Sequence, residues 1–193
     1  MFKDLVKANR SYRGYDESYR FREEELKELV DCARLAPSSV NMQPFRYYLA
    51  WEKDETDRIQ KQTRWARALP KLQLPHEGKY PTAFIIICQD LNISESLTRY
   101  QKDVGIVAQT MLLAAAEKGL GGCMIGNFGA KPLKEMLGLA QHLMPMLIVA
   151  FGKPDERIIL TEAEEGGDIR YYRDENDVHY VPKRKLEDII IRK

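Results

Sequence analysis

A continuous run of apolar residues at positions 83–88, reading AFIIIC, constrains the fold of this 193-residue chain more than any other feature. The run is far shorter than the roughly 20 residues of a membrane span, and its β-branched side chains favour a strand. A strand without polar side chains on either face must be covered on both faces. We therefore predict a strand in the middle of a sheet, with other structure packed on each side.

Four further segments supply elements around this strand. Residues 146–151 form a second apolar strand and the aromatic run at 46–51 a third. Apolar spacing predicts an amphipathic helix over 23–36, and residues 99–118 are apolar almost all round, which predicts a deeply buried helix. Because strands and helices do not alternate as βαβ units, an α+β fold is favoured. The length fits one domain spanning residues 1–193.

The remaining segments have weaker signals. Residues 54–69 resemble a surface helix, and 121–128 are rich in glycine, which predicts a turn. The polar stretch 155–177 shows no periodicity and is expected to be a long loop. A last strand-like piece, 178–181, precedes an apolar tail, 186–191, that needs a surface to cover.

Charge and cysteine content exclude several function classes. The net charge is +1, so no overall field attracts the chain to nucleic acid or an anionic membrane. Cys32, Cys88 and Cys123 form neither a CxxC pair nor a zinc spacing, the histidines lack an HExxH arrangement, and we expect no metal site. The charged N-terminus lacks the apolar core of a secretory signal, so a cytoplasmic location is expected.

The segment Arg10-Ser11-Tyr12-Arg13 places two guanidinium groups around a hydroxyl. Guanidinium forks and a hydroxyl match the oxygens of a phosphate monoester. The alternative is a solvated helix end, because two arginines alone are a weak signal.

A second segment, residues 36–45 (APSSVNMQPF), crowds Ser, Ser, Asn and Gln between two prolines directly after a predicted helix. Prolines restrict the backbone, and the amides offer both donors and acceptors. Such a set suits a heteroaromatic ring with imide and carbonyl groups, such as a flavin. The alternative is an Asx or Ser turn that faces solvent.

Other nucleotide and nucleophile motifs are missing from the sequence. The glycines at 121–128 follow a helix and do not match GxGxxG, and no GxxxxGK stretch exists. These glycines could let a backbone N–H approach a planar ligand, or form a simple turn. A hydrolase pair of Ser38 or Ser39 with a histidine is disfavoured, because neither serine lies in a GxSxG elbow.

In order and spacing, several segments together resemble motifs of the FMN-dependent nitroreductase family. Residues 10–15 resemble its RRSxRxF/Y motif, and residues 36–45 resemble APSSxNxQPW. The helix starting at Asp103, the turn 125–128 and the strand ending at 151–154 resemble its later motifs. The match covers roughly residues 10–154 and is looser beyond.

The resemblance implies an α+β fold with a central, mostly antiparallel sheet flanked by helices. It also implies a homodimer with an exchanged C-terminal segment and FMN at the interface. In such a site one chain holds the phosphate, the partner reaches the flavin with its PSSxN segment, and a turn contributes backbone near flavin N5. The corresponding residues here are, for the phosphate, Arg10, Ser11, Arg13, Lys183 and Arg184; for the partner segment, Pro37, Ser38, Ser39 and Asn41; and for the turn, Ile125, Gly126 and Asn127.

Three positions depart from the family pattern. Asn9 stands where the family usually has its first arginine, Gly126 replaces an acidic residue of some members, and Phe45 replaces a tryptophan. Lys79 is a poor equivalent of a lysine that some members draw from a loop. These differences leave the subfamily and the substrate open.

The implied activity is hydride transfer through flavin N5 in a ping-pong cycle. NADH or NADPH would be the reductant, and nitroaromatic or quinone-like small molecules the electron acceptors. No side chain is expected as an essential acid or base, because the chemistry belongs to the cofactor. Arg13 is the residue expected to stabilise negative charge near N1 and O2. The alternatives are a specialised member that dehalogenates reductively or degrades flavin, and a flavin-binding module without enzymatic activity.

Overall fold

The computed structural model describes residues 1–191, and its main element is a five-stranded antiparallel sheet. The long strand β5 lies next to β3 on one side, and β3 lies next to β2. Along its other side β5 pairs first with β4 and then with β1. The strands are β1 (Tyr15–Asp16), β2 (Phe45–Ala50), β3 (Ala83–Asp90), β4 (Gly121–Ile125) and β5 (Leu143–Pro154).

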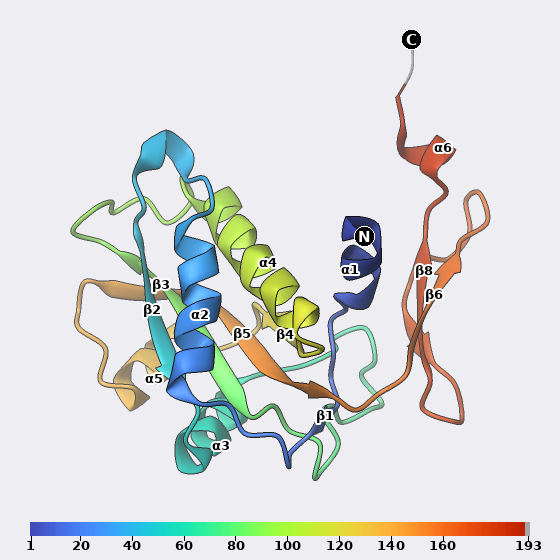
Figure 1. Ribbon diagram of the computed structural model, residues 1–193, viewed down its shortest axis with the longest axis horizontal. Helices are drawn as coiled ribbons and strands as arrows, with labels where there is room; N and C mark the ends of the chain where they lie inside the picture. The colour runs from blue at the N-terminus through green and yellow to red at the C-terminus, as the bar shows by residue number, and fades with distance from the viewer. Residues whose placement is uncertain (192–193) are drawn as a thin grey trace.

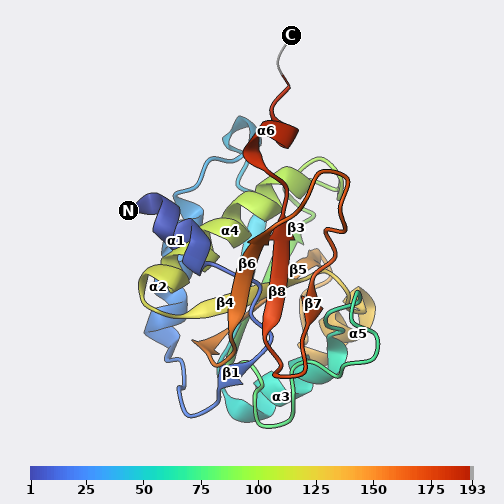
Figure 2. The same cartoon turned by 90° about the vertical axis from the view of Figure 1, so that its right-hand side faces the viewer.

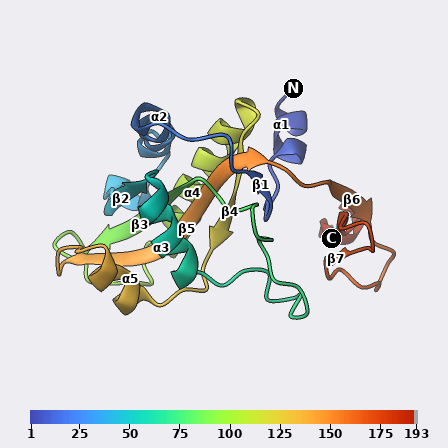
Figure 3. The same ribbon diagram turned by 90° about the horizontal axis from the view of Figure 1, so that it is seen from below.

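Helices cover both faces of this sheet (Figures 1 and 3). The helices α2 (Glu23–Arg34) and α4 (Gln101–Glu117) pack on one face, with one apolar cluster beneath them. The helices α3 (Lys53–Gln62) and α5 (Ala130–Met136) pack on the other face over a second cluster. The central, mostly antiparallel sheet flanked by helices that we predicted is thus confirmed.

Strand β3 accounts for this layered arrangement. All eight of its residues are buried. Ile85 and Ile87 belong to the cluster under α2 and α4, whereas Phe84 and Ile86 belong to the cluster on the opposite face. Side chains alternate along a strand, so one continuous apolar run supplies both clusters.

A smaller sheet follows at the C-terminal end (Figure 2). It joins β6 (Ile158–Glu162) in parallel to β8 (His179–Lys183), and β8 in turn pairs with β7 (Tyr172–Arg173). Segment 155–177, expected to be a long loop, therefore contains two strands. The N-terminal helix α1 (Phe2–Ala8) lies between α4 and this small sheet, and the short α6 (Leu186–Ile189) projects from it (Figure 1).

Two other expectations need correction. The glycine-rich segment 121–128 begins as the strand β4 and not as a turn. Residues 121–125 pair with the edge of β5 that lies opposite β3. Helix α4 is buried along one stripe only, and Ile106 on its outer side is 40% exposed. Helix α1 was not predicted. In residues 1–191, no helix has the length and apolar character needed to cross a membrane.

Candidate functional site

The segment Arg10–Arg13 lies beside β4, which fixes its position on the sheet. The Tyr12 N–H donates to the carbonyl oxygen of Gly122 at 3.1 Å, and Ser11 forms a parallel bridge with Gly122. Gly121 is necessary for this approach, since a Cβ there would lie 2.4 Å from a ring carbon of Tyr12. The first motif is therefore fixed against β4 by one isolated bridge and one backbone hydrogen bond.

Two neighbouring cavities bring this segment together with β8. The first has a volume of about 230 Å³ and the second about 270 Å³. Both are lined by Arg10, Ser11 and Lys183. The other lining residues are Arg13, Ile158, Tyr171, His179 and Val181 in the first, and Asn9, Gln109, Leu112 and Met124 in the second.

Two of the cations that line these cavities have no carboxylate partner in the part of the chain that the structure describes. Within residues 1–191, no carboxylate forms an ion pair with Arg10 or Lys183. Arg10 Nη2 donates to the carbonyl oxygen of Val6 at 2.7 Å, but its Nε is buried without a partner in the described chain. Burial lowers the pKa of Arg10. A bound anion would supply the missing acceptor and offset this desolvation.

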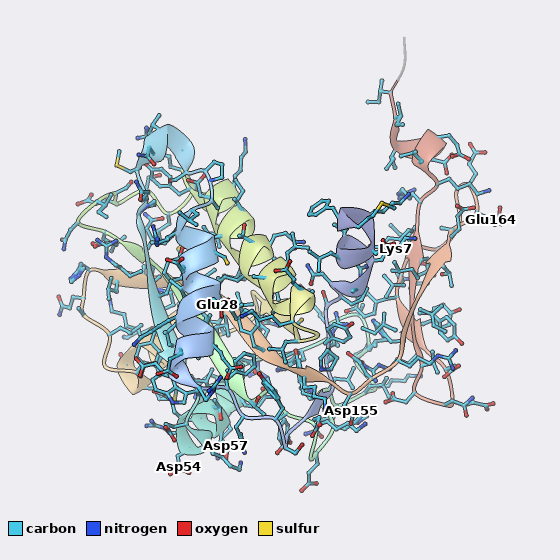
Figure 4. All side chains as sticks on the ribbon, viewed as in Figure 1. Lys7, Glu28, Asp54, Asp57, Asp155 and Glu164 are labelled. Atoms are coloured by element: carbon cyan, nitrogen blue, oxygen red, sulfur yellow. The ribbon has the colours of Figure 1, made fainter. Side chains whose placement is uncertain are left out.

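Lys79, by contrast, is already occupied. Its Nζ lies 3.0 Å from Asp155 Oδ2 and also donates to the Asp155 carbonyl oxygen. Figure 4 shows Asp155 at the base of the region between the main sheet and the small sheet. Lys79 therefore stays a poor candidate for a cofactor contact.

Arg13 is buried and held by several groups. Its Nη1 donates to the carbonyl oxygen of Ser11 at 3.1 Å and lies 3.2 Å from His179 Nε2. Its guanidinium carbon lies 4.9 Å from the centre of the Tyr171 ring. Its backbone N–H donates to Glu156.

Glu156 also forms an ion pair with Arg173, and both side chains are 3% exposed. Burial raises the pKa of Glu156, although both Arg13 and Arg173 oppose this effect. The sequence did not indicate Glu156, Tyr171, Arg173 or His179 as part of the site. The only available signal was that Glu156 follows closely after the family-like ending at 151–154.

The PSSxN segment is held by a buried acid that the sequence did not single out. The Ser38 hydroxyl donates to Asp103 Oδ2 at 2.8 Å, and the Ser39 N–H donates to the same oxygen at 2.7 Å. Ser38 Oγ also accepts from the N–H of Gln43 at 3.1 Å. Asp103, in the first turn of α4, is 4% exposed. The available signal in the sequence was an acidic residue within a segment predicted to form a largely apolar, buried helix.

The backbone that follows Ser38 adopts an unusual conformation. Around the 3-10 turn η1 (Ser39–Asn41), φ is +48° at Val40, +54° at Asn41 and +48° at Gln43. This region is costly for any side chain, and most of all for a β-branched one. Ser39 and Asn41 are exposed, as is Pro37. The strained turn therefore carries two exposed polar side chains, Ser39 and Asn41.

The third predicted group lies at the end of β4. Ile125 is buried in the core, whereas Gly126 and Asn127 are exposed. A Cβ at Gly126 would meet nothing within 4 Å, so a flat molecule could approach its backbone. The Asn127 carbonyl oxygen accepts from the Arg64 N–H at 3.0 Å, which anchors the turn.

The structure brings some of the predicted residues together and separates others. Arg10, Ser11, Arg13 and Lys183 meet, while Arg184 is exposed and lines neither cavity. Ser38 lines a different cavity of about 270 Å³ with Asp103 and Phe45. Figure 1 shows the segment between α2 and β2 at the far end of α2 from β1. One chain therefore does not unite the phosphate-type residues with the PSSxN segment.

Comparisons with known proteins agree with this architecture. A family model described as "Nitroreductase family" matches residues 6–153. An oxygen-insensitive NADPH nitroreductase of Helicobacter pylori is 26% identical over 70% of this chain and 78% of its own. A nitroreductase family protein of Streptococcus pneumoniae superposes with a TM-score of 0.69 at 17% identity and covers 100% of both chains. A protein of Exiguobacterium sibiricum, solved in complex with FMN, superposes with a TM-score of 0.66 at 20% identity, covering 81% of this chain and 89% of its own.

Proposed function

The chain belongs to the nitroreductase family, and from this premise we propose that it is an FMN-dependent oxidoreductase. It would take hydride from NADH or NADPH and reduce nitroaromatic or quinone-like small molecules. Support for the cofactor class comes from the FMN bound in the Exiguobacterium structure, and support for the reductant from the name of the Helicobacter relative.

One observation in this chain carries the proposal: Arg10, Ser11 and Lys183 converge without an acidic partner in the described chain. Two cations and a hydroxyl match the charge and the acceptor oxygens of a phosphate monoester. Met124 of β4 lines the second of these cavities, and the open backbone of Gly126 follows two residues later. We assign the phosphate to these cavities and the flavin ring to the end of β4.

Arg13 lines the same cavity as Arg10 and Lys183. This location favours a role on the phosphate side of the cofactor over a position near N1 and O2. Arg184 contributes less than Lys183 in this assignment, because it lies outside both cavities.

The site would be completed by a second copy of the chain. Each cavity is smaller than the roughly 300–1,000 Å³ typical of cofactor sites, so neither encloses a whole FMN. Ser39 and Asn41 are exposed on a strained turn, where they are free to reach a flavin held by another chain. The exposed tail Leu186, Ile189 and Ile190 offers apolar surface for a partner to cover, as an exchanged C-terminal segment would.

The chemistry of hydride transfer at N5 is what FMN supplies when it is bound. The residues of this chain bind and orient: Arg10 and Lys183 fix the anionic end, and Asp103 holds the partner-facing turn. No titratable side chain in the described cavities is needed to move a proton.

Flavin content tests this proposal directly. Purified protein, or protein titrated with FMN, should show flavin absorption and oxidise NADH or NADPH with a nitroaromatic or a quinone. A colourless protein that takes up no FMN would overturn it. A protein that binds FMN but turns over neither acceptor would be a specialised member of the fold, or a flavin-binding module.

A further inference from the structure

His179 on β8 is a buried side chain next to the charged end of Arg13. It is 1% exposed, and its Nε2 lies 3.2 Å from Arg13 Nη1. Tyr171 packs against both residues, with its ring centre 5.2 Å from that of His179 and 4.9 Å from the Arg13 guanidinium carbon. The small C-terminal sheet thus encloses an arginine from the N-terminal motif.

The hydrogen-bond chemistry of this pair allows one arrangement. A guanidinium group only donates, so the imidazole must accept through Nε2 and carry its hydrogen on Nδ1. Desolvation, together with the positive charges of Arg13 and Arg173, lowers the pKa of His179 to about 4, while Asp177 opposes this shift. The ring is therefore neutral at pH 7, and its Nε2 lone pair is available to Arg13.

Burying this neutral histidine is unfavourable for the free energy of folding. Nδ1 is buried and has no partner within residues 1–191. A buried donor without an acceptor is unfavourable, and an apolar ring at this position would carry no such donor. The acceptor atom Nε2 is thus what distinguishes histidine from an apolar ring at this position.

Resting on the proposed function, we infer that His179 is a positioning residue that aims Arg13 at the cofactor phosphate. Along β8, His179, Val181 and Lys183 line the same cavity. One strand therefore carries both a cation of the phosphate site and the acceptor that orients another. By this inference the small sheet is part of the phosphate site.

The test compares affinities for FMN and riboflavin, which differ by the phosphate. His179→Ala and His179→Phe should weaken FMN binding roughly tenfold, the loss of one hydrogen-bonded orientation, and leave riboflavin binding nearly unchanged. His179→Gln retains an acceptor oxygen and should restore most of the preference for FMN. Combining His179→Phe with Arg13→Ala should produce no loss beyond that of Arg13→Ala alone.

Distinct outcomes separate the possible failures. If the wild-type protein binds no FMN, the proposed function fails. If it binds FMN, but the alanine and phenylalanine variants keep the full FMN-to-riboflavin ratio, His179 does not orient Arg13. Where a variant does not fold, the nitrogen-15 spectrum of the wild-type imidazole decides: a hydrogen on Nδ1 alone is expected, and a hydrogen on Nε2 at pH 7 overturns the inference.

Discussion

His179 makes the stability of the protein depend on pH. Its pKa is about 4 in the folded chain, against a usual 6.5, so between these values the unfolded chain binds more protons. The contribution of His179 to the free energy of unfolding is fully present well above pH 6.5. It falls as the pH drops toward 4, by at most about 3 kcal/mol. We expect His179→Gln to remove this part of the slope. Urea denaturation of both proteins between pH 4 and 7 measures the difference, and parallel curves would contradict it.

The pair of Glu156 and Arg173 is the other residue-scale feature with a measurable consequence. Both side chains are 3% exposed, and Glu156 also accepts from the Arg13 N–H. Arg173 has a second carboxylate partner, Asp177, whereas Glu156 keeps only the Arg13 N–H once Arg173 is removed. Because this leaves a buried charge unpaired, Arg173→Ala should cost about 3–5 kcal/mol of unfolding free energy. Asp168→Ala, which removes the exposed pair with Arg170, should leave the denaturation midpoint unchanged. Equal effects of the two changes would contradict the burial argument.

At the scale of elements, Asp103 links helix α4 to the strained turn η1. Asp103→Ala removes the acceptor of two hydrogen bonds, from Ser38 Oγ and the Ser39 N–H. We expect faster amide exchange in residues 38–43 and an FMN affinity at least tenfold lower, because charged acceptors contribute about 1.5–3 kcal/mol per bond. Lys102→Ala, an exposed change in the same turn of α4, is the control. Unchanged exchange in the turn would show that Asp103 does not hold it.

Two glycines at the strand β4 have opposite surroundings and predict opposite results. A Cβ on Gly122 would lie 2.2 Å from the Ala150 carbonyl oxygen, which is backbone and cannot move aside. Gly122→Ala should therefore destabilise the protein by about 1–3 kcal/mol or more, as overpacking does. Gly126→Ala meets nothing within 4 Å and should leave stability unchanged. If the flavin ring lies at the end of β4, Gly126→Ala weakens FMN binding, and an unaltered affinity would move the ring elsewhere.

At the scale of the whole molecule, a site shared between two chains makes a prediction about mixtures. Arg10→Ala damages the phosphate side, and Asn41→Ala damages the segment that reaches a partner. In a mixed dimer one site combines both defects and the other contains neither. Reassembling equal amounts of the two variants should then restore about a quarter of the wild-type sites, because half of the dimers are mixed.

Flavin titration of the mixture, against each variant alone, measures this recovery. A site built within one chain gives no recovery at all. Light scattering supplies an independent check, since a monomer that is fully loaded with FMN would contradict the shared site.

The sequence by itself determined the layered core. The apolar run of β3 required other structure to cover both of its faces. The apolar spacing of α2 predicted a helix, because helical geometry brings residues three and four positions apart onto one face. The sequence also indicated Arg10 to Arg13 and the PSSxN segment as candidate site residues, but through their resemblance to motifs and not through their contacts.

Tertiary structure alone decided the rest, because the deciding contacts join residues far apart in the sequence. Glycine has low strand propensity, so β4 became a strand only because β5 offered an edge with unpaired backbone groups. Asp103 reached Ser38 through the packing of α4. Lys183 and His179 met the N-terminal motif because β8 folds back over it, and no local pattern encodes that approach.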